Sequence, residues 1–258
     1  MFRIVSNNII FFSNYKNINK LEKLIIFHGL GGEAIDFLFL KNLNLKKIQV
    51  LVAILPGHSN TYLRLSGDPL LEFSKKLHLF FKKKNIKNFS FYVHSMGNII
   101  SILLIRFFLR KKCKLLINNE GNITSSDAGF VTSKTITYPE EEFINIGFNK
   151  LKKKCAESYD SNIKKWALSL DKIQPSYFYR YCKYTVFWSK TEKLLSWVNF
   201  YFKKKIYVYG EKSKNQKVLD MMFGHKKKCL VNVGHFAHFE KSVYIKQLIF
   251  KELTVKGT

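Results

Sequence analysis

Residues 89–98, FSFYVHSMGN, place one serine, Ser95, between two apolar segments. The aromatic and β-branched residues before Ser95 predict a buried strand, and the apolar run 98–108 predicts a buried helix. A serine in so tight a strand–turn–helix junction is typical of a nucleophile elbow, whose flanking positions must be small. Gly97 meets this requirement, whereas Val93 stands where the G-x-S-x-G pattern has its first glycine. The other interpretation is that Ser95 is a helix N-cap, a position that favours serine.

Outside this stretch, buried strands and helices alternate along most of the 258 residues. The strands are predicted at 24–27 (LIIF), 50–55 (VLVAIL), 91–93 (FYV), 115–118 (LLIN), 205–210 (KIYVYG) and 228–233 (KCLVNV), with two short ones in the first 20 residues. Further helices are predicted at 70–84, 214–223 and 239–253. This alternation predicts the α/β class, with a mostly parallel sheet covered by helices on both faces.

The alternation is lost between residues 122 and 202, where the chain is helix-like and rich in lysine and aromatic residues. We therefore predict a core formed by residues 1–121 and 203–258 and a helical lid, or cap, formed by 122–202. The large aromatic residues of the lid are predicted to make an apolar pocket: Trp166, Tyr177, Phe178, Tyr179, Tyr181, Tyr184, Phe187, Trp188 and Trp197.

Glycine-containing turns follow the predicted strands. They are HGLGG (28–32), PGH (56–58), HSMG (94–97), NEG (119–121), GEKS (210–213) and GHF (234–236). In parallel sheets, ligands bind beyond the carboxyl ends of the strands, where these turns meet. Together the turns supply a serine, carboxylates and histidines, so we predict a catalytic site at this edge of the sheet.

These turns, in this order, resemble those of the α/β-hydrolase fold superfamily over nearly the whole chain. The resemblance is carried by HGLGG, LPGHSNT, VHSMG, VYGEKS and VGHFAHFE. It implies an α/β-hydrolase fold with Ser95 as the nucleophile and His235 as the general base. It also implies an oxyanion hole made by the backbone N–H groups of Leu30 and Met96. Serine attacks once a neighbouring imidazole takes its proton, and the developing oxyanion needs fixed donors.

The other histidines receive different interpretations. His238 competes with His235 for the role of base, but the superfamily's histidine usually follows a glycine after the last strand, which favours His235. His28 and His94 flank functional backbone and are interpreted as structural, and His58 is expected to brace a loop.

The acid of the triad is ambiguous. In the common superfamily pattern, G-x-x-D follows the late strand, and here Ser213 stands in the place of the aspartate. Glu120 is favoured as the acid, because it follows a strand beside a glycine and opens a stretch that resembles an EGNLTxxD motif of some bacterial α/β-hydrolases. Glu211 is the main alternative, followed by Asp127 and Asp220. Glu120 could instead form a salt bridge that anchors the lid.

The charge balance is strongly basic, with 44 Lys and Arg against 18 Asp and Glu and a formal net charge of +26. Such a balance can attract nucleic acid, an anionic membrane or an acidic carrier protein. The lysines occur in scattered clusters (82–84, 111–112, 152–154, 203–205 and 226–228) with no nucleic-acid-binding motif. Nucleic-acid binding is therefore disfavoured, and compositional bias of an AT-rich genome is the simpler explanation.

The cysteines predict neither a metal site nor a disulfide framework, because they are widely spaced: Cys113, Cys155, Cys182 and Cys229. We expect reduced thiols, a cytosolic protein and no cofactor. No signal peptide is recognised, and no apolar run approaches the roughly 20 residues that cross a bilayer.

Taken with the resemblance, these features predict a serine hydrolase that cleaves a carboxylic ester or thioester through an acyl-enzyme. Its substrate would be a small molecule or an acyl group on an acidic carrier protein. A serine nucleophile argues against the haloalkane dehalogenase and epoxide hydrolase chemistries of the superfamily, which use aspartate. The alternative is an inactive binding protein on the same fold.

Overall fold

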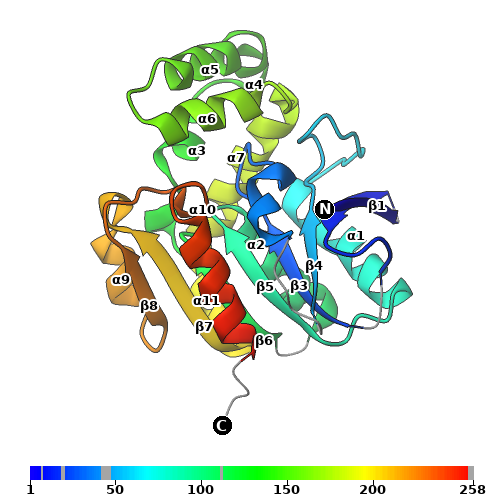
Figure 1. Cartoon of the computed structure of the whole chain (residues 1–258). Coiled ribbons are helices and arrows are strands. Elements are labelled where there is room, and N and C mark those ends of the chain that lie inside the picture. Colours follow the sequence, from blue (N-terminus) through cyan, green and yellow to red (C-terminus); the bar gives the residue numbers. More distant parts are fainter. Residues whose placement is uncertain (7, 19–20, 42–47, 111–112, 255–258) are drawn as a thin grey trace.

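The sheet forms as an eight-stranded, mostly parallel structure in the computed structural model, which describes residues 1–6, 8–18, 21–41, 48–110 and 113–254. Lys111, Lys112 and residues 255–258 of the predicted core lie outside the described residues. The strands are β1 (Phe2–Ser6), β2 (Ile9–Ser13), β3 (Glu22–Phe27), β4 (Ile48–Ala53), β5 (Phe89–His94), β6 (Cys113–Asn119), β7 (Phe202–Gly210) and β8 (Lys226–Leu230). Their order is β1-β2-β4-β3-β5-β6-β7-β8 (Figure 1).

The strands β3 to β8 pair in parallel, whereas β1 and β2 form an antiparallel hairpin whose strand β2 pairs antiparallel with β4. The carboxyl ends of β3 to β7 therefore share one edge of the sheet. The prediction of a mostly parallel sheet with helices on both faces is confirmed.

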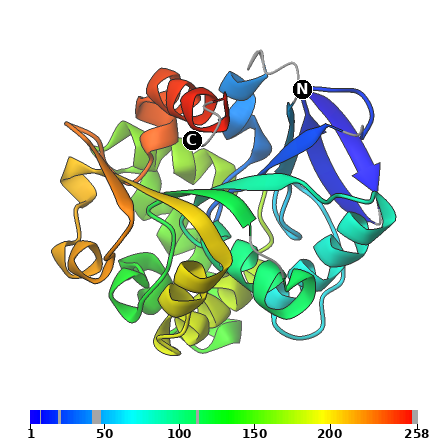
Figure 2. The ribbon, with the colours of Figure 1, turned by 90° about the horizontal axis from the view of Figure 1, so that it is seen from below.

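The two faces of the sheet are distinguished by the period-two alternation of the strands. In β3, Ile25 and Phe27 belong to one hydrophobic cluster, and Leu24 and Ile26 belong to the other. The first face is covered by α1 (Pro69–Lys83), α2 (Gly97–Leu103) and α8 (Leu194–Tyr201), and the second by η1 (Ala34–Leu40) and α11 (Ser242–Thr254). Figure 2 shows the two layers on opposite sides of the sheet.

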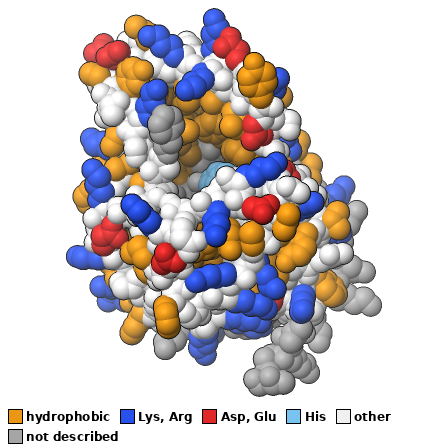
Figure 3. Space-filling model, turned by 90° about the vertical axis from the view of Figure 1, so that its left-hand side faces the viewer, with side chains coloured by type: hydrophobic (Ala, Val, Ile, Leu, Met, Phe, Trp, Pro, Cys, Tyr) orange, Lys and Arg blue, Asp and Glu red, His pale blue; other side chains and the backbone are white. Residues whose placement is uncertain are grey.

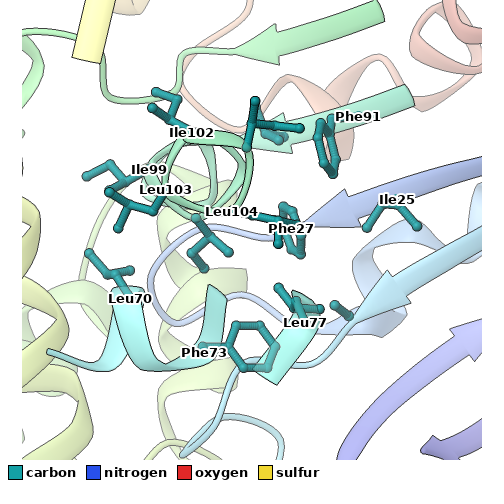
Figure 4. Close-up of a cluster of buried hydrophobic side chains, with 14 of the residues drawn as sticks. Ile25, Phe27, Leu70, Phe73, Leu77, Phe91, Ile99, Ile102, Leu103 and Leu104 are labelled. Atoms are coloured by element: carbon teal, nitrogen blue, oxygen red, sulfur yellow. The ribbon is translucent and has the colours of Figure 1, made fainter. Parts of the chain in front are cut away.

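The first face packs α1 and α2 against the central strands (Figure 4). Asp68 begins α1, because its carboxylate accepts hydrogen bonds from the N–H groups of Leu70 and Leu71, and Pro69 suits the first helical position. The core side chains of this layer include Ile25, Phe27, Leu70, Phe73, Leu77, Phe91, Ile99, Ile102, Leu103 and Leu104. The layer holds β5 and α2, and with them the turn at Ser95, between rigid neighbours.

Several predicted boundaries differ from the structure, and three of the differences have a local cause. The helix predicted at 98–108 is α-helical only to Leu103 and continues as a π-helical segment, Leu104–Leu109. The last helix is divided into α10 (Ala237–Glu240) and α11, because Lys241 leaves helical geometry. The strand β8 ends at Leu230 rather than at residue 233, because Asn232 adopts a φ of 61° and its N–H donates to the Glu211 carboxylate.

The chain between β6 and β7 forms a helical layer beyond the carboxyl edge of the sheet (Figure 1). Its elements are η3 (Ser125–Asp127), α3 (Phe130–Thr135), α4 (Glu140–Glu142), η4 (Phe143–Gly147), α5 (Phe148–Ala156), α6 (Ser161–Leu170) and α7 (Pro175–Lys190), after which α8 returns to the first face of the sheet. Hydrogen bonds attach it to the core, among them one from the Gln174 N–H to the Gly57 carbonyl and one from the Tyr177 hydroxyl to the Leu63 carbonyl. Within the described ranges, no helix combines the length and apolarity needed to cross a bilayer.

Candidate active site

Ser95 occupies the tight turn between β5 and α2, with a φ of 51°. This left-handed conformation costs an L-residue about 1–2 kcal/mol, so the surroundings must hold it. The Ser95 N–H donates to the Asn119 carbonyl at 3.1 Å, and the Ser95 carbonyl accepts from the N–H groups of Asn98 and Asn122. A Cβ atom at Gly97 would lie 2.5 Å from the Phe27 carbonyl oxygen. The turn therefore requires glycine at 97.

The HGLGG turn lies beside this serine and is braced by two buried histidines. His28 Nε2 accepts from the Leu55 N–H, and His58 Nε2 accepts from the Gly31 N–H at 3.1 Å. Both bonds require a neutral imidazole with the proton on Nδ1. Burial favours that state, because it lowers the pKa of His28 to about 4 and that of His58 well below its usual value. The expectation that His58 braces a loop is confirmed.

The backbone N–H groups of Leu30 and Met96 donate no hydrogen bond to another described residue. Leu30 belongs to the HGLGG turn, and Met96 follows Ser95 at the start of α2. The carbonyl of Leu30 accepts a hydrogen bond from the Trp166 indole N–H at 2.8 Å, which connects the helical layer to this turn. Free N–H groups beside a serine can receive a developing oxyanion.

His235 and Glu120 are joined by a short contact. His235 Nδ1 lies 2.7 Å from Glu120 Oε2, and the Glu120 side chain is only 8% exposed. The other carboxylate oxygen, Oε1, accepts from the Gly210 N–H at 2.7 Å and from the Ser213 hydroxyl at 2.6 Å. Three donors thus hold one buried carboxylate, and the imidazole is oriented by it.

Glu120 reaches this position because β6 and β7 are neighbours in the sheet. It adopts a φ of 45°, and its N–H donates to the Val208 carbonyl on β7. This places its side chain beside Gly210 and Ser213, where β7 ends. The residue that stands in the usual aspartate position, Ser213, is therefore a hydrogen-bond donor to a carboxylate that comes from the adjacent strand.

The other candidate acids make different contacts. Glu211 accepts from the Asn232 N–H, and Asp220 accepts from the Gln216 amide. Asp127 accepts from the N–H groups of Ile123 and Thr124 and so closes its own turn. Burial raises the pKa of Asp127 to about 7, against these hydrogen bonds, which favour the ionised form. Among the described residues, only Glu120 makes a carboxylate contact with His235.

Two further histidines pack around His235. His94 Nε2 donates to the His235 carbonyl, and the two rings lie 4.7 Å apart between centroids. His238 is buried and stacks on Phe37, and burial lowers the pKa of His238 to about 3. His94 therefore positions the backbone of His235, and His238 packs in the core rather than facing the serine.

A cavity of about 540 Å³ opens above this edge and includes Ser95 and His235 in its wall. Figure 3 shows the hollow with histidine at its floor, hydrophobic side chains around it and basic side chains near its rim. Its apolar lining comes from both the helical layer and the core: Leu30, Met96, Val131, Tyr138, Phe143, Leu151, Cys155, Ile163, Trp166 and Phe236. Ser95 and His235 form no hydrogen bond in the described structure, and such bonds often tighten only when substrate is bound.

The prediction that the lid aromatics form the pocket is wrong for all of them except Trp166. The other eight do not line the cavity. Trp188, for example, donates its indole N–H to the Asp68 carboxylate and packs against Phe107, on the side of α7 that faces α1. The aromatic content of the segment indicated an apolar interior, but it did not indicate which side of each helix faces the cavity.

The strand order, the turn at Ser95 and the helical layer inserted after β6 define the class: the chain has the α/β-hydrolase fold. It is similar to a structure from a study of carboxylesterases of the thaumarchaeon Nitrososphaera gargenis (TM-score 0.76, 16% identity, 98% of each chain covered). It is also similar to MenH from S. aureus (TM-score 0.74, 12% identity, 94% of this chain and 97% of that one). A third is a hydrolase from Oleispira antarctica (TM-score 0.73, 15% identity, 97% and 95%).

No protein-family model matches the chain, and no curated protein matches it by sequence. At these identities the structural similarity shows the fold. The activity of this chain has to be argued from its own residues.

Sequence reasoning did not foresee three contributors to the site. These are the Gly210 N–H and the Ser213 hydroxyl, which hold the Glu120 carboxylate, and His94, which holds the His235 backbone. Ser213 was recognisable as the residue in the aspartate position, but its contact with Glu120 depends on the pairing of β6 with β7, which no local pattern shows.

Proposed function

We propose that this protein is a serine hydrolase that cleaves a carboxylic ester or thioester through an acyl-enzyme. The observation that carries the proposal is the 2.7 Å contact between His235 Nδ1 and Glu120, in a cavity wall that also contains Ser95. A serine, an imidazole and a buried carboxylate bonded to the imidazole are the parts of a catalytic triad.

In the proposed mechanism, Ser95 Oγ attacks the substrate carbonyl while His235 Nε2 takes its proton. Glu120 accepts a hydrogen bond from the Nδ1–H of His235, which sets the tautomer that leaves Nε2 as the base and stabilises the imidazolium. The N–H groups of Leu30 and Met96 stabilise the oxyanion of the tetrahedral intermediate. His235 then donates its proton to the leaving alcohol or thiol, and a water molecule activated by His235 hydrolyses the acyl-enzyme.

The cavity supports an acyl substrate, because most of its lining surface is apolar and Ser95 and His235 both lie in its wall. The structural neighbour from Nitrososphaera gargenis comes from a study of carboxylesterases, which favours ester cleavage as the first activity to assay. Cys155 and Cys182 are buried free thiols. They fit the proposal of a cytosolic enzyme whose substrate is a small molecule or an acyl group on a carrier protein.

The proposal is tested by labelling with a fluorophosphonate probe, with wild type compared with Ser95→Ala and Ser158→Ala. Ser158 also lines the cavity, and its hydroxyl accepts from the Asp160 N–H and contacts neither His235 nor Glu120, so it is the matched control. We expect labelling of wild type and Ser158→Ala and none of Ser95→Ala, with similar thermal melts. Absence of labelling and ester turnover in wild type would refute the proposal and favour a binding protein on this fold.

A further inference from the structure

One side of the cavity is formed by a face of α5 that carries both apolar and basic side chains. Lining residues recur from Gly147 to Ser158 at three- and four-residue spacing, which is the period of one helix face. Leu151 is half-buried, whereas Lys150 and Lys154, one turn apart, are exposed. The face therefore offers an apolar surface bordered by two ammonium groups.

The lysines of α5 differ in their ion pairs. Lys152 and Lys153 point away from the cavity and pair with Asp171 and Glu157. In contrast, Lys150 and Lys154 line the cavity and form no ion pair with another described residue. The carboxylates near α5 thus neutralise its outer lysines and leave the charge of the cavity-facing pair uncompensated.

The other Lys and Asp side chains of the cavity lining are one of each. A third lysine, Lys134 on α3, also lines it. The one carboxylate in the lining, Asp127, accepts hydrogen bonds from the Ile123 and Thr124 backbone and from the Asn122 amide, so its oxygens are engaged within its own turn. A solute in the cavity therefore meets apolar walls and positive charge.

We infer that the ester taken by this site has an apolar segment next to its carbonyl and an anionic group, a carboxylate or phosphate, at its far end. This inference rests on the proposed function and names its substrate class. The apolar segment is buried against the cavity wall, and Lys150 and Lys154 attract the anion. Because both lysines are exposed, the anion stays hydrated and binding does not require burial of an ion pair.

The test compares two esters of equal chain length, methyl octanoate and the monomethyl ester of octanedioic acid. Each exposed ion pair strengthens binding by up to about fivefold, so with two lysines wild type should favour the anionic ester by about three- to twentyfold in kcat/KM at low salt. The preference should shrink as salt is added, because ions screen exposed charges. Two fluorophosphonates that end in a methyl or a carboxylate group report the same preference from labelling rates.

The variants assign the effect to the lysines. In Lys150→Gln/Lys154→Gln the ratio of the two kcat/KM values should fall to about one, mainly through the KM of the anionic ester. In Lys152→Gln/Lys153→Gln, which removes the same charge from the outer side of α5, the ratio should remain at the wild-type value. An unchanged ratio in the first variant would overturn the assignment.

The two proposals fail in different ways. Equal kcat/KM values for the two esters in wild type would overturn the inference and leave the proposed hydrolase intact. Absence of turnover of both esters, together with absence of labelling by both probes, would overturn the proposed function itself.

Discussion

Replacement of Glu120 by glutamine tests the arrangement of the site with the smallest change in shape. The carboxylate now accepts from the Gly210 N–H, the Ser213 hydroxyl and His235 Nδ1. An amide has one acceptor oxygen and an NH₂ donor. If its oxygen stays on Gly210, its NH₂ faces His235 and forces the proton onto Nε2, which can then no longer accept from serine. If the amide flips, NH₂ meets the Gly210 N–H, and two donors face each other.

The expected loss follows from these two unfavourable states. The equivalent change in a chymotrypsin-like serine protease, where the tautomer is also wrong, lowers kcat by about 10⁴-fold, or roughly 5 kcal/mol. The His235 side chain is 40% exposed, so water can bond to the imidazole in some of the variant molecules and restore the tautomer that accepts from serine. We therefore expect Glu120→Gln to lose between about 10² and 10⁴ in kcat, with little change in KM.

The assay is steady-state hydrolysis of p-nitrophenyl acetate by purified protein, with Glu211→Gln as the control. Glu211 contacts the Asn232 N–H and not His235, so its variant should stay within about threefold of wild type. Ser213→Ala keeps the Gly210 donor on Glu120, so its loss should be smaller, about threefold to thirtyfold. The reverse ranking, with Glu211→Gln the crippled enzyme, would refute the assignment of Glu120.

Three further outcomes are expected. Gly97→Ala should lower the free energy of unfolding by about 1–3 kcal/mol in urea titrations, because its Cβ would lie 2.5 Å from the Phe27 carbonyl oxygen; an unchanged midpoint would contradict this. Leu151→Trp should narrow the cavity and cut kcat/KM for long acyl esters about tenfold more than for acetate, whereas Trp188→Ala, outside the cavity, should leave the chain-length profile unchanged. Burial lowers the pKa of His238 to about 3, so the free energy of unfolding of wild type falls as pH drops below the unfolded pKa of about 6.5. His238→Phe lacks this loss, so its free energy of unfolding should gain about 2 kcal/mol relative to wild type between pH 8 and pH 5. A constant difference between the two proteins would contradict this.

The sequence predicted the architecture well because the information was local. Each central strand is a short apolar run, each turn after it carries glycine, and the two faces follow from period-two alternation, as in Leu24 to Phe27. The end of β8 was missed because it depends on a contact between Asn232 and Glu211, which are 21 residues apart. Residue type alone does not show such a contact.

The site was less predictable, because its parts meet across strands. Glu120 was favoured from its place after a strand, but its contacts with Gly210 and Ser213 arise from the pairing of β6 with β7. The aromatic residues of the inserted segment were assigned to the pocket from composition. In the structure, Trp188 and its neighbours pack between helices, since tertiary packing decides which side of a helix is buried.

The mutual hydrogen bonds of the Ser95 and Glu120 turns have a mechanical consequence. The Ser95 N–H donates to Asn119 and its carbonyl accepts from Asn122, so the residues on both sides of Glu120 are bonded to the nucleophile turn. Under the proposed roles, the backbone therefore fixes the spacing between serine and acid, and His235, whose carbonyl is bonded to His94, has to span that spacing. Because the contact of the imidazole with Glu120 is already formed, substrate binding has only to bring the imidazole and the Ser95 hydroxyl together.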